Sequence, residues 1–194
     1  MTIPAPIRAA VEGAVAGSRR PAEEGFIDVL AALGALPDAE DAGWGTHRHH
    51  EYETWVIGRA VAQVRLGALA RVAPLRLALA PEVVGELPAG PGTGVFVTRY
   101  AACPGEQLRP VQAGATALRP AAVQRFRREI RMMADHGLVH RYTRGGVHWR
   151  VSSETGTLVL NAWQALQPGD PEACEEMCQQ VDRALEHLQR WMPR

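Results

Sequence analysis

The chain has no lysine: all 21 of its basic residues are arginine. Enzymes that transfer a phosphoryl group from ATP commonly hold the phosphates with a lysine ammonium, so this absence counts against that chemistry. The 21 acidic residues balance the arginines, and the formal net charge is zero. Neutrality argues against a broad electrostatic affinity for nucleic acid or for an anionic membrane surface. Only a local patch of arginines could supply such an affinity.

Cysteines and long apolar runs are also scarce. The chain has three cysteines, Cys103, Cys174 and Cys178. This number is small, and because it is odd the cysteines cannot all pair, so it does not indicate an extracellular disulfide framework. Cys174 and Cys178 would share a helix face, and we interpret them as small core residues rather than metal ligands. No apolar run approaches the ~20 residues that cross a bilayer, and residues 1–8 do not resemble a secretory signal. We therefore expect a soluble, cytoplasmic protein without a membrane contact, a cofactor or a metal.

The periodicity of apolar residues predicts an α+β fold. Helical spacing recurs in five segments, which predicts helices over 5–17, 22–36, 51–71, 120–136 and 171–191. Residues 38–45 are rich in glycine and aspartate and predict a loop. Strand-like segments at 82–87 and 94–100, joined by a stretch rich in glycine and proline, predict an antiparallel hairpin.

The helix over 120–136 has the most complete set of signals. Pro120 suits its first turn, and Gly137 suits a left-handed residue just after its end. Its predicted buried stripe consists of Val123, Phe126, Ile130 and Met133. The last helix has a similar stripe, made of Met177, Val181, Leu185 and Leu188.

Two groups of motifs follow one another in a distinctive order. His136-Gly-Leu-Val-His-Arg-Tyr142 precedes an apparent hairpin of strands 147–151 and 157–161, which runs into Asn161-Ala-Trp163. Upstream, Val95-Phe-Val-Thr-Arg-Tyr100 precedes Pro104-Gly-Glu-Gln-Leu108. In order and spacing these segments resemble the hinge, catalytic loop and metal-binding turn of protein kinases and aminoglycoside phosphotransferases.

The resemblance implies a truncated, protein-kinase-like two-lobed fold. A helical segment over 1–45 would precede a small antiparallel strand lobe over 46–108, and a helical lobe with the catalytic-loop-like hairpin would occupy 109–194. The helix predicted over 51–71 would stand where the regulatory helix of a kinase belongs. Hinge candidates are Thr98, Arg99 and Tyr100.

The same resemblance implies a site that has lost the residues needed for phosphoryl transfer. The catalytic-loop positions are His140, Arg141, Tyr142 and Val147, and the metal-turn positions are Asn161, Ala162 and Trp163. Kinases place anionic or amide ligands there, including an aspartate at the position of Tyr142 and another at that of Asn161. A neutral phenol is no acceptor of protons at pH 7, valine offers no oxygen, and an amide binds magnesium poorly. Trp163 would fill the magnesium pocket, and His140 would brace the loop against the core.

These positions favour a catalytically silent, pseudokinase-like scaffold that acts as a regulatory or adaptor module for another protein. The five tryptophans exceed what a small core needs, and aromatic residues are common at binding hot spots. A homodimer through residues 171–192, including Trp191, is one form that such binding would take.

Two alternatives stay open. Helix 120–136 and a wing over 138–151 also resemble a winged-helix DNA-binding unit. Its phosphate contacts would come from Arg125, Arg127, Arg128, Arg131, Arg141, Arg144 and Arg150. The second alternative is an atypical active phosphotransferase, in which Asp135 or Glu154 replaces a lost carboxylate.

A cluster of His47, His49 and His50 could ligate zinc or sense pH. We favour a solvent-exposed polar entry to the following helix, because no fourth ligand is near in the sequence.

Overall fold

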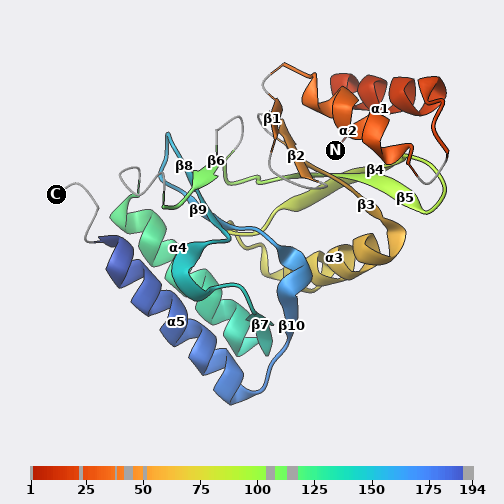
Figure 1. Ribbon diagram of the computed structural model, residues 1–194. Coiled ribbons are helices and arrows are strands. Elements are labelled where there is room, and N and C mark those ends of the chain that lie inside the picture. Colours follow the sequence, from red (N-terminus) through yellow and green to blue (C-terminus); the bar gives the residue numbers. More distant parts are fainter. Residues whose placement is uncertain are drawn as a thin grey trace. The chain divides into compact units, whose positions relative to one another are not determined.

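The computed structural model describes residues 2–21, 24–37, 39–41, 46–49, 52–103, 108–112 and 118–189. The chain forms an α+β fold with antiparallel sheets (Figure 1). It divides into two compact units: residues 1–66 with 82–99 form unit 1, and residues 67–81 with 100–194 form unit 2. Unit 1 contains one five-stranded sheet and unit 2 contains two smaller sheets, and the boundary between the units falls within the helix over 59–72.

Unit 1 is built on a five-stranded antiparallel sheet with the strand order β1-β2-β3-β5-β4. The strands are β1 (Ala39–Asp41), β2 (Thr46–His49), β3 (Tyr52–Gly58), β4 (Glu82–Pro88) and β5 (Thr93–Arg99). Strand β5 pairs with β3 on one side and with the edge strand β4 on the other. The hairpin predicted at 82–87 and 94–100 is therefore confirmed as β4 and β5.

Helices α1 (Ala5–Gly17) and α2 (Phe26–Gly34) cover one face of this sheet (Figure 1). Ile7 and Val11 from α1 and Val29 and Leu33 from α2 are buried against Val56, Leu87, Val95 and Val97 of the sheet. The helix predicted over 5–17 is confirmed. The one predicted over 22–36 is shorter than expected, although its apolar spacing correctly identified Val29 and Leu33 as core residues.

The predicted helix over 51–71 is wrong in its first half. Residues 52–58 form strand β3, and only Arg59–Val72 form a helix, α3. Strand β3 is buried on both faces, because residues 53–56 are all buried and successive residues of a strand point to opposite faces. It therefore lacks the alternation that marks a half-exposed strand. Its aromatic and β-branched residues favour the extended conformation. Residues 39–41 also form a strand where a loop was predicted, and residues 42–45 lie outside the described residues.

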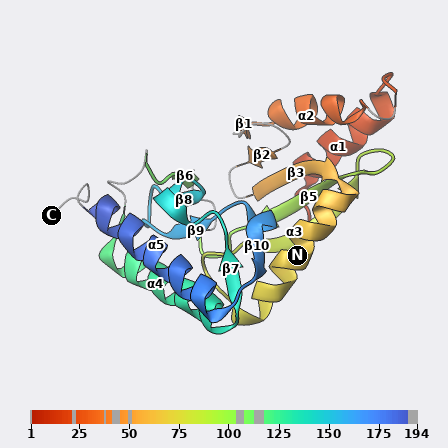
Figure 2. The ribbon, with the colours of Figure 1, turned by 60° about the horizontal axis from the view of Figure 1, so that its bottom comes forward.

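Unit 2 is built on two long helices, α4 (Pro120–Asp135) and α5 (Pro171–Gln189), which pack side by side (Figure 2). The predicted stripe of α4 is buried, with none of its four residues more than 1% exposed. Gly137 follows α4 with a positive φ of 65°, which glycine adopts without strain. The α5 stripe is buried as well. Both helix predictions are confirmed, except that residues 190–194, with Trp191, lie outside the described part of the chain.

Two small sheets complete unit 2. Strands β6 (Leu108–Pro110), β8 (Trp149–Ser152) and β9 (Leu158–Leu160) form one, and β7 (Leu138–His140) pairs with β10 (Leu166–Pro168) in the other. The predicted hairpin of 147–151 and 157–161 is confirmed as β8 and β9. Short 3-10 helices follow β7 at Arg144–Gly146 (η3) and β9 at Trp163–Ala165 (η4), and another, η1 (Ala73–Leu75), follows α3.

A buried carboxylate attaches the segment after η1 to the helices of unit 2. Glu129 of α4 accepts a hydrogen bond from the Leu79 backbone N–H at 2.7 Å. The Leu79 carbonyl in turn accepts a hydrogen bond from the Leu160 N–H at 2.8 Å. Arg125 lies 3.7 Å from Glu129, as expected for an i,i+4 pair. These bonds position the end of β9, where the candidate site begins.

Candidate functional site

The two motif segments of the sequence meet at His140, the last residue of β7. The His140 Nε2 lies 3.0 Å from the Asn161 carbonyl oxygen, and its Nδ1 lies 3.3 Å from the Tyr142 backbone N–H. Since a backbone N–H can only donate, Nδ1 must accept, and the ring proton of a neutral imidazole is then on Nε2. One ring thus joins the catalytic-loop-like segment to the metal-turn-like segment.

The His140 ring is almost fully buried, with 1% of the residue exposed. Burial lowers the pKa of His140 from its usual 6.5 to about 4, and the nearby His148 adds to the decrease, while the bond to Asn161 opposes it. The imidazole is therefore neutral at pH 7. Its backbone N–H donates to the Met177 sulfur at 3.2 Å, which ties the same residue to α5.

The turn after β9 is fixed by bonds within itself. Asn161 accepts the Ala162 N–H on its side-chain Oδ1 at 2.8 Å, and Ala162 has a left-handed φ of 61°. Trp163 is buried, its indole N–H donates to the Leu160 carbonyl at 3.0 Å, and its ring meets the His140 ring edge-on at 5.6 Å. The Asn161 amide oxygen is thus engaged by the backbone, and an indole occupies the interior of the turn.

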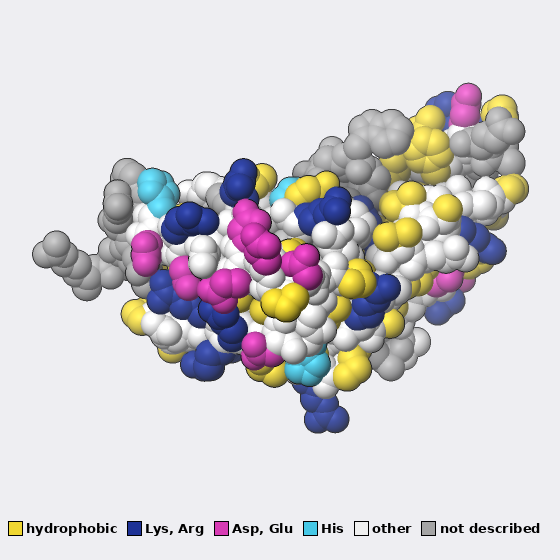
Figure 3. All heavy atoms as spheres, turned by 90° about the horizontal axis from the view of Figure 1, so that it is seen from below, with side chains coloured by type: hydrophobic (Ala, Val, Ile, Leu, Met, Phe, Trp, Pro, Cys, Tyr) yellow, Lys and Arg dark blue, Asp and Glu magenta, His cyan; other side chains and the backbone are white. Residues whose placement is uncertain are grey.

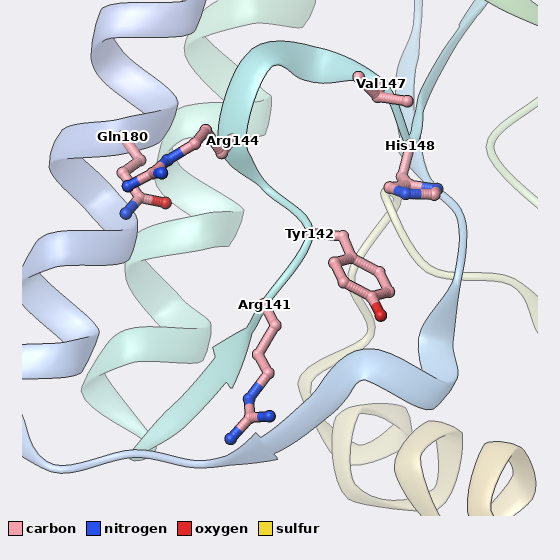
Figure 4. A pocket seen from close by; sticks show the side chains of 6 residues that line it. All are labelled: Arg141, Tyr142, Arg144, Val147, His148 and Gln180. Carbon is pink, nitrogen blue, oxygen red and sulfur yellow. The ribbon is translucent and has the colours of Figure 1, made fainter.

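A pocket of about 430 Å³ opens beside the loop that follows β7. It is lined by Arg141, Tyr142, Arg144, Val147, His148 and Gln180. The Tyr142 and His148 rings stack, with their centroids 4.9 Å apart and their planes 30° apart. In Figure 4 the Arg144 side chain points toward Gln180 of α5, whereas Arg141 runs in a different direction, toward β10.

The pocket is cationic. Arg141 and Arg144 are exposed, and neither forms an ion pair within the ranges that the structure describes. None of the six lining residues is acidic. Burial lowers the pKa of His148, and the positive charge of Arg150 lowers it further. Such a pocket attracts anions and repels divalent cations.

The predicted hinge residues lie at the boundary of the two units. Thr98 and Arg99 end strand β5 in unit 1, and Tyr100 begins the next stretch of unit 2. Thr98 is fully buried and donates to the Glu53 carbonyl at 3.3 Å. Tyr100 donates its hydroxyl to the Leu160 carbonyl at 2.6 Å, next to Asn161. Residues 104–107 of the motif after the hinge lie outside the described residues.

Other candidate residues have mainly structural surroundings. His47 lies on strand β2 and is 8% exposed, so the expected exposed helix entry is wrong for this residue. The side chain of His49 and the whole of His50 lie outside what the structure describes. Cys174 and Cys178 are buried free thiols whose pKa is raised by burial, which confirms their interpretation as core residues. In the described residues, no three histidine, cysteine or acidic side chains gather into a metal-binding group.

Several arginines of helix α4 are paired with acids. Arg127 lies 3.0 Å from Asp182, and Arg131 lies 2.6 Å from Glu175, both across to helix α5. On the face seen in Figure 3, basic and acidic side chains lie next to one another over this helical region. The positive charge of this helix pair is therefore compensated, unlike that of the pocket.

Comparison with known proteins finds no family model that matches the chain and no curated protein with significant similarity. None of the described helices has the length and apolar character needed to span a membrane.

Sequence reasoning identified Arg141, Tyr142 and Val147 of the pocket, and Arg144 only as part of the DNA-binding alternative. It missed His148 and Gln180. His148 lies in the turn just before β8, one residue from the buried Trp149, and only packing brings Gln180 of α5 to this loop.

Proposed function

We propose that this chain is a catalytically silent, kinase-like scaffold that serves as a regulatory or adaptor module and binds another protein. The observation that supports the proposal most is the bond between His140 and the Asn161 carbonyl. It joins two segments that are far apart in the sequence and that resemble the catalytic loop and the metal turn. These segments are held together by neutral groups, and the pocket beside them is lined by arginines.

The chemistry of this arrangement opposes phosphoryl transfer. Transfer from ATP depends on anionic side chains that hold magnesium and on an acceptor for the substrate hydroxyl. Here the Tyr142 ring stacks on His148, and the Asn161 side-chain oxygen accepts a backbone N–H. Val147 has no polar side-chain atom. The guanidinium groups of Arg141 and Arg144 add a repulsion for any divalent cation.

Unit 1 offers a second argument. In protein kinases a lysine on the third strand pairs with a glutamate of the following helix and contacts the phosphates. In this chain the acid, Glu53, is on strand β3, and the base, Arg65, is on helix α3. The Arg65 guanidinium lies 4.9 Å above the Trp55 ring. Burial lowers the pKa of Arg65, and the Glu53 charge opposes part of this decrease. In the proposed kinase-like arrangement, strand β3 would carry a buried carboxylate where the phosphate-binding lysine of a kinase stands.

The test is transfer of labelled phosphate from ATP with magnesium, to the protein itself or to a general acceptor. We expect no incorporation and no ATP hydrolysis above a buffer control. Incorporation that is lost in Asp135→Ala or Glu154→Ala, two exposed acids outside the pocket, would instead establish the atypical phosphotransferase.

The DNA-binding alternative has a separate test. Nonspecific binding to duplex DNA should appear first at low salt, because phosphate attraction is least screened there. Three of the seven arginines proposed for phosphate contacts already have acidic partners in the described structure. We therefore expect no salt-dependent shift of random duplex DNA in a gel.

A further inference from the structure

We propose that the pocket formed by residues 141–148 and Gln180 binds an acidic segment of the partner protein that carries an apolar side chain. This inference rests on the proposed function, because it specifies the partner of a binding module. It is carried by the charge, the exposed apolar surface and the geometry of the pocket.

The charge of the pocket requires a complementary ligand. Arg141 and Arg144 project two guanidinium groups without an ion-pair partner in the described ranges. Glu176, one turn before Gln180 in α5, accepts a hydrogen bond from the Gln180 amide at 2.8 Å. Among the described residues, this carboxylate forms no ion pair with either arginine. Carboxylates of a partner would supply the missing counter-charges.

The apolar surface of the pocket is exposed in the same place. Tyr142 is 47% exposed and Val147 is 60% exposed, although both are large side chains. The Tyr142 ring is held on one side by its stack with His148, and its backbone N–H is bound to His140. An ordered, half-exposed aromatic ring loses little entropy when it is covered, which is typical of binding hot spots.

The geometry favours an extended segment over a single small anion. The two arginine side chains run in different directions from the loop (Figure 4). One phosphate or carboxylate would therefore contact only one of them, whereas a peptide with separated acidic residues can contact both. A central apolar residue of that peptide would lie against Tyr142 and Val147. The Gln180 amide has a second N–H and a carbonyl, which can bind the peptide backbone.

The experiment measures the fluorescence anisotropy of a labelled glutamate-rich peptide with one central phenylalanine. Comparison peptides replace the glutamates with lysine or the phenylalanine with alanine. The variants are Arg141→Gln, Arg144→Gln and Tyr142→Ala, and the matched control is Arg128→Gln, an exposed arginine of α4 that does not line the pocket. Thermal melts verify that each variant is folded.

We expect the acidic peptide to bind and its affinity to fall with added salt. Each pocket arginine variant should weaken binding about two- to five-fold, which is the effect of one exposed ion contact. Tyr142→Ala should weaken it about thirty-fold, the usual threshold of a hot spot. Arg128→Gln should have no effect.

Four outcomes would overturn the inference: no binding at low salt, equal binding of the lysine peptide, an equal loss in Arg128→Gln, or complete competition by inorganic phosphate. The last would identify a small-anion site. If the peptide does not bind and no phosphate transfer is detected, only this inference fails. If phosphate transfer is detected, the proposed function itself fails, whatever the peptide does.

Discussion

Helices α4 and α5 and the neighbouring pair of loops are stabilised in different ways, although they belong to the same unit. The helices meet through continuous apolar stripes, and surface ion pairs flank the contact. The loops that carry His140 and Asn161 are joined by a hydrogen bond between these two residues. The Asn161 turn is fixed by a hydrogen bond to the Ala162 N–H, and Ala162 has a left-handed backbone conformation. The helix contact spreads over many side chains, whereas the loop contact depends on single atoms.

This difference indicates where a change of function can occur. An apolar interface tolerates the loss of one surface charge, because its free energy comes mainly from buried area. A loop site that depends on one imidazole keeps its conformation only while that ring stays neutral and in place. The loop can therefore keep its path without a metal or a carboxylate, since the described bonds that support it come from an imidazole, an amide and backbone groups.

The largest effect is expected in the buried stripe of helix α4. Phe126 of α4 is fully buried, with its ring centroid 4.9 Å from that of Trp149. Phe126→Ala should lower the free energy of unfolding by about 3–5 kcal/mol, because it removes apolar contact and leaves a cavity. Urea unfolding followed by circular dichroism measures the change. Met132→Ala, on the same helix but 40% exposed, should change it by less than about 1 kcal/mol. Equal losses would mean that burial of the α4 stripe does not stabilise the fold.

The loop contact should instead show a dependence on pH. The pKa of His140 is about 4 in the folded protein and 6.5 as a free group, so between these values the unfolded chain binds more protons. The contribution of His140 to the free energy of unfolding is then fully present well above pH 6.5. It falls as the pH decreases toward 4, by about 2 kcal/mol at pH 5. His140→Gln should be less stable at pH 7 and should lack this part of the slope. Parallel pH profiles for the two proteins would contradict the prediction.

Parts of this contrast could be predicted from the sequence. Helix α4 was predicted almost to its last residue, because its spacing, its N-terminal proline and its terminal glycine agree. Strand β3 was mistaken for a helix, because a strand buried on both faces has no alternation and its apolar residues also fit a helical stripe. Local patterns determine an element only when its surroundings differ from one face to the other.

The candidate site was predictable to a similar extent. The sequence indicated His140, Tyr142 and Asn161, because they occupy positions of a motif. It could not indicate Gln180, which reaches the pocket through the packing of α5. Nor could it indicate that Ala162 adopts a left-handed conformation, since alanine normally avoids it. Features that depend on tertiary contacts leave no local signal.

A smaller effect of opposite sign is expected at Ala162. Its φ of 61° is strained for a residue with a Cβ atom, whereas glycine adopts it freely. Ala162→Gly should therefore raise the free energy of unfolding by up to about 1 kcal/mol, while the bond from its N–H to Asn161 remains. Ala165→Gly is the matched control in the same turn, at a buried position without positive φ, and should destabilise the protein. Thermal unfolding of both variants distinguishes relief of strain from a general tolerance of glycine.

The smallest effect is expected at the ion pairs between the helices. Arg127 and Asp182 lie 3.0 Å apart, but their side chains are 26% and 48% exposed. Water screens such a pair, so Arg127→Gln should cost only about 0.2–1 kcal/mol, and the cost should shrink as salt is added. A double-mutant cycle with Asp182→Asn isolates the interaction of the two charges. A coupling as large as the loss in Phe126→Ala would mean that the helices, like the loops, depend on specific polar bonds. A small, salt-sensitive coupling would leave buried area as the force that joins α4 to α5.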